Sequence, residues 1–205
     1  SGHMSFILHV RDEHAQVTLE APGLHNCSNS CAAAAIAYSA DIEFQAIVEG
    51  LENFTSTVNR MESMRTPEGL NILNDTYNAN PASMASALDT IKSMDAGKRM
   101  AILGDMLELG AEADQLHRDI GQHVARSKIH FLGVYGSLAE HIARAAIDNG
   151  MEPGNVVIFY EKQRVVDWVA ELLHTEQLHQ DDWILVKASR GLALDTVVDQ
   201  LVEKC

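Results

Sequence analysis

Continuous apolar runs alternate with amphipathic stretches over residues 59–205. Runs such as Met100-Ala101-Ile102-Leu103 and Ile184-Leu185-Val186 are apolar throughout, which is typical of parallel strands covered on both faces. The stretches between the runs repeat apolar residues at helical spacing. We expect strands at residues 70–75, 99–104, 131–135, 156–160 and 183–187, and helices at 81–94, 111–128, 137–149, 162–174 and 192–203. The pattern predicts an α/β fold, a Rossmann-like, doubly wound domain with a mostly parallel sheet.

The first part of the chain has a different pattern. Apolar residues cluster or alternate at 6–10 and 15–19 around a polar turn, which predicts a β-hairpin. An Ala-rich run follows, and we expect it to form a helix capped by Asn26 or Ser28. Residues 41–54 have the spacing of a second helix. We interpret residues 1–4, Ser-Gly-His-Met, as a scar of tag removal outside the fold.

Composition and charge narrow the possible partners. The net charge of -14 argues against a nucleic acid or an anionic membrane surface as partner. No apolar run approaches the roughly 18 residues of a membrane span. An odd number of cysteines, 3, favours reduced thiols and a cytoplasmic setting. We interpret Cys27 and Cys31 as small apolar helix residues rather than metal ligands, and we expect Cys205 to be mobile.

The richest candidate chemistry lies at residues 71–81, where a short apolar run ends in a carboxylate, a phenol and several amides. Pro81 suits the first turn of a helix, so these polar side chains follow the carboxyl end of a strand. Open α/β sheets bind ligands at that position. The structural alternative is that the Asn and Asp residues only cap the helix, which is their commonest use.

Two further polar stretches follow predicted strands. Residues 104–110 contain Asp105 and Glu108, which could bind a substrate or cap the next helix. Lys187, Ser189 and Arg190 follow the last strand and would form a compact anion site. The alternative for this basic turn is pairing with surface acids.

The amino-acid sequences of these stretches resemble one family. Asp75-Thr76-Tyr77-Asn78-Ala79-Asn80-Pro81, followed by Ser83-Met84, is similar to the opening motif of the C-terminal domain in the ATP-dependent Mur ligase family of cell-wall synthesis. Residues 104–110, with His117, resemble the signature of the branch that adds D-alanyl-D-alanine. The basic turn resembles Lys-Gly-Ser-Arg, with Ala188 in place of Gly. Residues 22–33 resemble the adenine-side motif of the central domain.

The resemblance implies roles for individual residues. Asn26 and Asn29 would face adenine, because an amide offers both a donor and an acceptor, and His25 would be structural. Arg60 would reach the ATP phosphates, although Asn59 stands where the family usually has Gly. Asp75 would lie near the ribose, with Tyr77 and Asn78 also at the nucleotide. The implied substrate-binding residues are Asn80, Asp105, Glu108, Lys187, Ser189 and Arg190, and the implied catalytic residues are Arg60, Lys187 and Arg190.

The activity that the resemblance implies is an ATP- and Mg²⁺-dependent ligation. It would join D-alanyl-D-alanine to UDP-N-acetylmuramoyl-tripeptide through an acyl phosphate. The phosphate loop G-x-x-x-x-G-K-[ST] does not occur in the 205 residues. We therefore expect a fragment that is inactive alone, with residues 5–58 from the central ATP-binding domain and 59–205 forming the C-terminal domain. Two alternatives stay open: a Mur-type ligase for another amino acid, and a non-catalytic Rossmann-like nucleotide-binding module.

Overall fold

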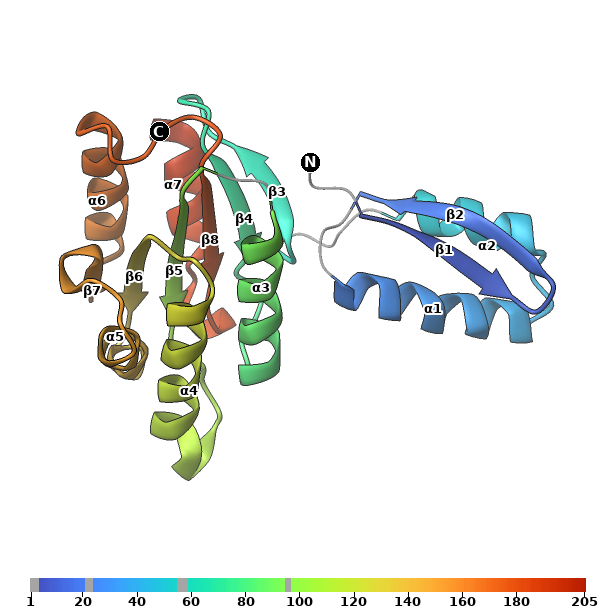
Figure 1. The fold of residues 1–205 in the computed structure, drawn as a ribbon, viewed down its shortest axis with the longest axis horizontal. Coiled ribbons are helices and arrows are strands. Elements are labelled where there is room, and N and C mark those ends of the chain that lie inside the picture. Colours follow the sequence, from blue (N-terminus) through green and yellow to red (C-terminus); the bar gives the residue numbers. More distant parts are fainter. Residues whose placement is uncertain (1–3, 21–23, 55–58, 95–96) are drawn as a thin grey trace. The chain divides into compact units, whose positions relative to one another are not determined.

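A computed structural model describes residues 4–20, 24–54, 59–94 and 97–205 of the chain. These residues form two compact units, Ser1–Thr57 and Val58–Cys205. Figure 1 labels the helices and strands of both units. Each unit has its own hydrophobic core, so each is described separately.

The first unit is a β-hairpin with two helices. Strands β1 (Met4–Val10) and β2 (Glu13–Leu19) pair antiparallel, as the alternating pattern predicts. Helices α1 (Leu24–Ser39) and α2 (Phe44–Glu52) contribute Ala34, Ile47 and Val48 to a core with residues of both strands. Met4 pairs with Leu19, so this residue of the supposed scar belongs to the strand.

The predicted start of α1 is wrong. Asn26 and Ser28 lie inside the helix, which includes Leu24. The first helical turn also has N–H groups without intrahelical partners, so short polar residues are tolerated there as well as at the cap. Their presence therefore does not define where the helix begins.

The second unit contains a six-stranded sheet in the order β3-β4-β8-β5-β6-β7. The strands are β3 (Glu62–Arg65), β4 (Asn71–Asp75), β5 (Arg99–Gly104), β6 (Phe131–Tyr135), β7 (Val156–Phe159) and β8 (Trp183–Lys187). All neighbours pair parallel except β3, which runs antiparallel to β4 at the edge. The prediction of a mostly parallel sheet is confirmed, and β3 is an addition to it.

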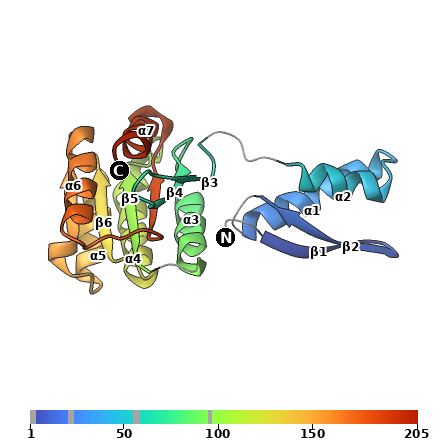
Figure 2. The ribbon, with the colours of Figure 1, turned by 90° about the horizontal axis from the view of Figure 1, so that it is seen from above.

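Helices cover both faces of this sheet (Figure 2). One core joins alternate strand residues such as Leu73, Leu103 and Leu185 to helices α3 (Pro81–Ser93), α4 (Ala113–Arg126) and α5 (Glu140–Asp148). The other joins the intervening strand residues to α6 (Lys162–His174) and α7 (Asp195–Lys204). Because side chains of a strand point alternately to opposite faces, continuously apolar strands supply both cores. The doubly wound architecture is confirmed.

Short 3₁₀ turns precede some of the helices and strands: η1 (Gly110–Glu112), η2 (Pro153–Asn155) and η3 (Arg190–Leu192).

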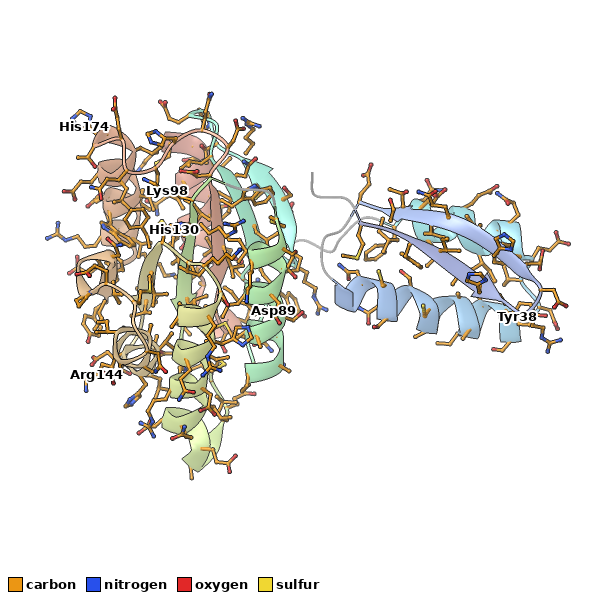
Figure 3. The ribbon with its side chains drawn as sticks, in the orientation of Figure 1. Tyr38, Asp89, Lys98, His130, Arg144 and His174 are labelled. Atoms are coloured by element: carbon orange, nitrogen blue, oxygen red, sulfur yellow. The ribbon has the colours of Figure 1, made fainter. Side chains whose placement is uncertain are left out.

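The expectation of a mobile Cys205 is wrong. Its side chain is buried, and its carbonyl accepts the N–H of Glu68 at 2.8 Å. Burial raises the pKa of the Cys205 thiol. Figure 3 shows how densely side chains fill the space around the sheet.

Candidate functional site at three adjacent strand ends

Strands β4, β8 and β5 lie side by side, and their carboxyl ends are at the same level. Asp75 pairs in register with Lys187, and Lys187 with Leu103. The loops that follow these strands begin at residues 76, 188 and 105. The structure therefore brings together the three stretches of candidate chemistry in the second unit, at the edge where α/β sheets bind ligands.

Asp75 and Lys187 form a buried ion pair at this edge. Lys187 Nζ lies 2.6 Å from Asp75 Oδ2, and the two side chains are 2% and 13% exposed. Nζ also donates to the carbonyl of Asn78 at 2.8 Å, while Asp75 Oδ1 accepts the N–H of Met61 at 3.3 Å. Lys187 is thus bound by protein oxygens, and its predicted contact with a substrate anion stays a prediction.

Asn80 caps a helix, as the structural alternative for residues 71–81 expects. Its side-chain oxygen accepts the N–H of Ser83 at 2.8 Å, and Ser83 Oγ accepts the N–H of Asn80 at 3.0 Å. This reciprocal capping box starts α3, with Pro81 in the first turn. Asn78 has a local bond too, from the N–H of Ala79 to its Oδ1 at 2.9 Å. The ligand contacts predicted for Asn78 and Asn80 stay predictions.

Arg60 lies in a tight turn beside this loop. Asn59 has a φ of 63°, which explains why Gly suits the position and why Asn, a residue tolerant of left-handed backbone, can replace it. Asn74 Nδ2 donates to Asn59 Oδ1 at 2.8 Å. Asn74 is a site residue that the motif analysis missed. The signal for it is a buried amide between the apolar pair Ile72-Leu73 and Asp75 at the end of the strand.

Hydrogen bonds and close packing with several neighbouring residues hold the loop after β5 in place. Asp105 is buried, and its Oδ1 accepts the N–H of Ala139 at 2.6 Å. A Cβ on Gly136, whose φ is 110°, would come within 2.5 Å of the Asp105 carboxylate oxygens. Buried His117 accepts the N–H of Met106 at its Nε2, 2.9 Å away, so its Nδ1–H donates to the Ala113 carbonyl at 2.7 Å. Asp105 and His117 thus hold the loop.

Glu108 differs from Asp105. It is exposed and has a φ of 64°, so it projects from the tip of a loop that its neighbours fix. No hydrogen bond or ion pair engages its carboxylate within the part of the chain that the structure describes. The sequence left open whether these two carboxylates bind substrate or hold the loop. Only Glu108 is available to a ligand without breaking a protein contact.

Ser189 joins the three loops. Its N–H donates to the Asp105 carbonyl at 3.1 Å, its Oγ accepts the N–H of Leu107 at 2.9 Å, and its hydroxyl lies 3.4 Å from the Ala79 carbonyl. Ser189 is buried, whereas the side chain of Arg190 is 61% exposed and 3.6 Å from Asp195 Oδ2. Ala188 has no positive φ, so the Gly of the resembling motif is not needed there.

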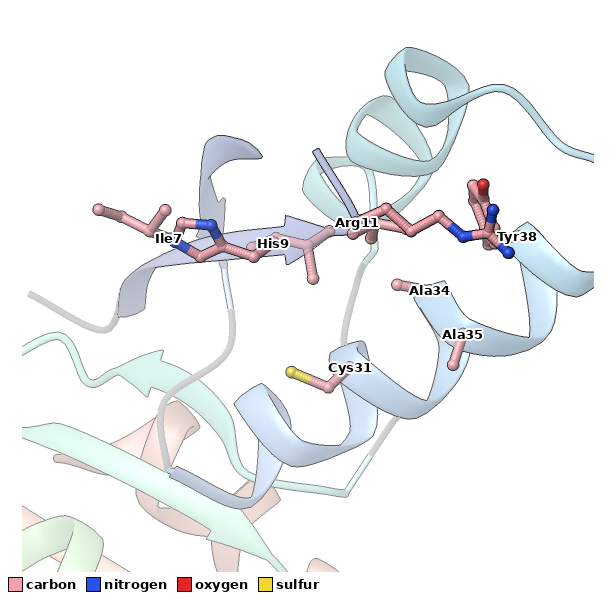
Figure 4. Close-up of a pocket in the computed structure, with 9 residues that line it drawn as sticks. Ile7, His9, Arg11, Cys31, Ala34, Ala35 and Tyr38 are labelled. Atoms are coloured by element: carbon pink, nitrogen blue, oxygen red, sulfur yellow. The ribbon is translucent and has the colours of Figure 1, made fainter. Parts of the chain in front are cut away.

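The predicted adenine residues lie in the other unit. Asn26 and Asn29 are on α1, and Asn29 is exposed. A groove of about 480 Å³ runs between β1 and α1 and is lined by Ile7, His9, Cys31, Ala34, Tyr38 and their neighbours (Figure 4). Neither Asn lines this groove. Nothing structural is described for the His25 side chain, whose expected role lies outside the described residues.

The expected partners include a metal ion and exclude a membrane. Within residues 4–20, 24–54, 59–94 and 97–205, no group of three or more His, Cys, Asp or Glu side chains could hold a metal ion. Over the same ranges, no helix combines the length and apolar character that crossing a membrane requires.

A doubly wound sheet with charged loops at adjacent strand ends defines a ligand-binding α/β domain. Residues 59–190 match the family model described as Mur ligase, glutamate ligase domain, and the chain belongs to the Mur ligase family. The chain is 36% identical to UDP-N-acetylmuramoyl-tripeptide--D-alanyl-D-alanine ligase of Bacillus subtilis over 182 residues, covering 88% of this chain and 38% of that protein. The enzyme of the same name from Escherichia coli is 32% identical, with 97% and 41% covered.

A crystal structure of MurF from Acinetobacter baumannii is also similar. Its TM-score is 0.87 at 28% identity, with 99% of this chain and 43% of that chain covered. The chain thus spans about two fifths of the length of the curated relatives it matches, 38% and 41% for the two named here.

Proposed function

We propose that this chain is part of an ATP-dependent ligase that joins D-alanyl-D-alanine to UDP-N-acetylmuramoyl-tripeptide in peptidoglycan precursor synthesis. The observation that carries the proposal is the name of its relatives, which match 88% and 97% of the chain at 36% and 32% identity. Residues 104–110, the stretch resembling the D-alanyl-D-alanine-adding branch, form a loop held firmly at the candidate site. A rigid loop is what a substrate-selecting site requires.

The exposed charges at the strand ends support this reaction. D-alanyl-D-alanine carries a negative carboxylate and a positive amine. Arg190 is positive and Glu108 is negative, so the two side chains complement these groups. They lie on adjoining loops that Ser189 links. The Arg190 guanidinium can bind a carboxylate through two parallel hydrogen bonds. In the reaction, the amine would attack an acyl phosphate of the tripeptide, forming the amide bond and releasing phosphate. The chain's part is to orient the amine for that attack.

ATP fits the residues at hand better than Mg²⁺ does. We assign Arg60 to the phosphates, because its side chain is exposed beside the Asp75 loop, and Asn26 and Asn29 to the adenine. Asp75 remains our candidate for the ribose through any lone pairs that Lys187 and Met61 leave free. We assign no residue of this chain to Mg²⁺, because the described residues contain no group of three or more His, Cys, Asp or Glu side chains that could hold a metal ion. We place the ligase in the cytoplasm, in keeping with its free cysteines.

A substrate panel tests the proposal. The complete ligase that contains this chain would be assayed for ADP release with UDP-N-acetylmuramoyl-tripeptide and each of D-alanyl-D-alanine, D-alanine, D-glutamate and a diamino acid. We expect release only with D-alanyl-D-alanine. Release with another amino acid would favour a different Mur-type ligase, and no release with any of them would favour a non-catalytic nucleotide-binding module.

A further inference from the structure

The backbone that carries Arg60 is fastened to the loop that carries Tyr77. The carbonyl of Asn59 accepts the N–H of Tyr77 at 2.9 Å, and the side chains of Asn59 and Asn74 are bonded at 2.8 Å. On the other side of Arg60, the N–H of Met61 donates to Asp75 Oδ1 at 3.3 Å. Residues on both sides of Arg60 are thus attached to residues 74–77, while its side chain remains exposed.

The guanidinium of Arg60 lies over the ring of Tyr77. Its Cζ is 4.0 Å from the ring centroid, well within the ~6 Å at which an aromatic face attracts a cation. Tyr77 is 43% exposed, so this contact lies at the surface of the unit and not in its core. A packing role alone would not require a ring at this position.

The kind of partner distinguishes Arg60 from the other cations at the strand ends. Lys187 is paired with Asp75, and Arg190 lies near Asp195, whereas no ion pair of the described residues includes Arg60. A carboxylate partner neutralises a cation and occupies its N–H donors. A ring restrains the cation but leaves its charge and its donors available to an oxyanion.

We propose that Tyr77 is a positioning residue, whose ring holds the Arg60 guanidinium ready for a phosphate group of ATP. This inference rests on the proposed function, in which Arg60 faces ATP. It gives Tyr77 a different role from the nucleotide contact that the resemblance implies, because the ring face is engaged by Arg60. The role requires the ring but not the phenolic hydroxyl.

The ring contact can be tested on this chain without any nucleotide. The Nε–Hε resonance of Arg60 would be recorded by NMR in the parent chain and in Tyr77→Phe and Tyr77→Leu. A ring above a guanidinium displaces its proton resonances, so we expect the displacement to persist in Tyr77→Phe and vanish in Tyr77→Leu. An unchanged Arg60 resonance in Tyr77→Leu would overturn the proposal.

Tyr160 supplies a matched control. It is 62% exposed, and its hydroxyl donates to Glu140, a bond that lowers the pKa of that carboxyl. Tyr160→Leu removes an exposed phenol from the same unit, away from Arg60 in the sequence. We expect it to leave the Arg60 resonance in place, and a change equal to that of Tyr77→Leu would overturn the proposal.

Kinetics of the complete ligase then test the function of the contact. Tyr77→Leu should raise the KM for ATP about two- to fivefold, the size expected of an exposed cation–π contact, and Tyr77→Phe should not. In an Arg60→Ala background, Tyr77→Leu should have no further effect. Additive effects, or a Phe variant as impaired as Leu, would overturn the positioning role. A normal KM in Arg60→Ala would instead refute the proposed contact of Arg60 with ATP, even with the ring contact intact.

Discussion

At the scale of single residues, the buried pair of Lys187 and Asp75 is the contact on which the candidate site depends most. Both side chains are almost fully enclosed, and the pair joins the ends of β4 and β8. Removing one partner leaves a charge buried without compensation, which is far more costly than replacing both. Lys187 therefore shapes the site whether or not it also contacts a ligand.

We expect Lys187→Met to lower the free energy of unfolding of the second unit by about 3–5 kcal/mol, because Asp75 is left unpaired. Adding Asp75→Asn should restore much of the loss, since the amide is neutral and still accepts the Met61 N–H. Urea unfolding measures both. The control is Arg65→Met, which breaks an exposed pair with Asp181 and should cost less than about 1 kcal/mol. Equal losses in the two single variants would contradict the buried-pair interpretation.

The side chain of Arg190 is our candidate for binding the carboxylate of the dipeptide. Its side chain is exposed and its pairing with Asp195 is loose, at 3.6 Å, so it can turn toward a ligand. Arg190→Lys keeps the charge but loses the fork that matches a carboxylate. In the complete ligase, the KM for D-alanyl-D-alanine should rise roughly tenfold, equivalent to about 1.4 kcal/mol, while the KM for ATP stays unchanged.

Arg144→Lys is the matched control for Arg190→Lys. Arg144 extends from α5 at the surface and pairs with Glu140 one helical turn away (Figure 3). The same substitution there should alter neither Michaelis constant. If Arg190→Lys raises the KM for ATP and not that for the dipeptide, the turn after β8 serves the nucleotide and our assignment is wrong.

At the scale of elements, α4 and α5 approach each other closely at Gly121. A Cβ there would lie 2.4 Å from the Ile142 carbonyl oxygen and 2.7 Å from the Ala145 Cβ. Gly121→Ala should therefore force the helices apart and destabilise the second unit by about 1–3 kcal/mol, despite the better helix propensity of Ala. Thermal unfolding measures the change.

Gly154 offers the same substitution without the clash. It lies in η2 of the same unit, and a Cβ there would meet no atom within 4 Å. Gly154→Ala should change the stability by no more than about 0.5 kcal/mol. A Gly121→Ala variant as stable as this control would mean that the two helices separate at little cost.

The elements that could be predicted from the sequence are those with a strong apolar period. The bounds of β5, β6, β8 and α6 coincide with the expected ranges. Strand β3, Glu62-Ser63-Met64-Arg65, was missed because it is short and mainly polar, and it exists through its pairing with β4. Helix α5 starts at Glu140 and not at residue 137, and Asp105 binds the N–H of Ala139 just before it. Such long-range contacts leave no local pattern.

The residues of the candidate site could be predicted from the sequence, but the hydrogen bonds and ion pairs between them could not. Polar residues after apolar runs indicated the three strand ends, and the structure places those ends side by side. The pairing of Lys187 with Asp75 spans 112 residues, so no local pattern indicates it. The same holds for Ser189, whose bonds to Leu107 and Ala79 link two loops, while its predicted contact with a substrate anion stays a prediction.

At the scale of the whole molecule, the two units supply different halves of the proposed chemistry. The second unit contains the candidate dipeptide residues and Arg60, and the first contains the candidate adenine residues. Neither contains a G-x-x-x-x-G-K-[ST] loop, whose backbone and Lys supply the main contacts to nucleotide phosphates. The phosphate contacts that the 205 residues can offer therefore depend largely on Arg60.

We accordingly expect this chain by itself to release no ADP above background when given ATP, UDP-N-acetylmuramoyl-tripeptide and D-alanyl-D-alanine. A coupled assay of ADP release measures this. Turnover on the order of 1 s⁻¹, ordinary for an enzyme, would show that the phosphate loop is dispensable and that the 205 residues hold a complete site. Calorimetric titration with D-alanyl-D-alanine provides the complementary measurement. The parent chain would be compared with both Arg variants in the heat released on binding the dipeptide. If Arg190→Lys weakens this binding and Arg144→Lys leaves it unchanged, the second unit recognises the dipeptide without any catalysis.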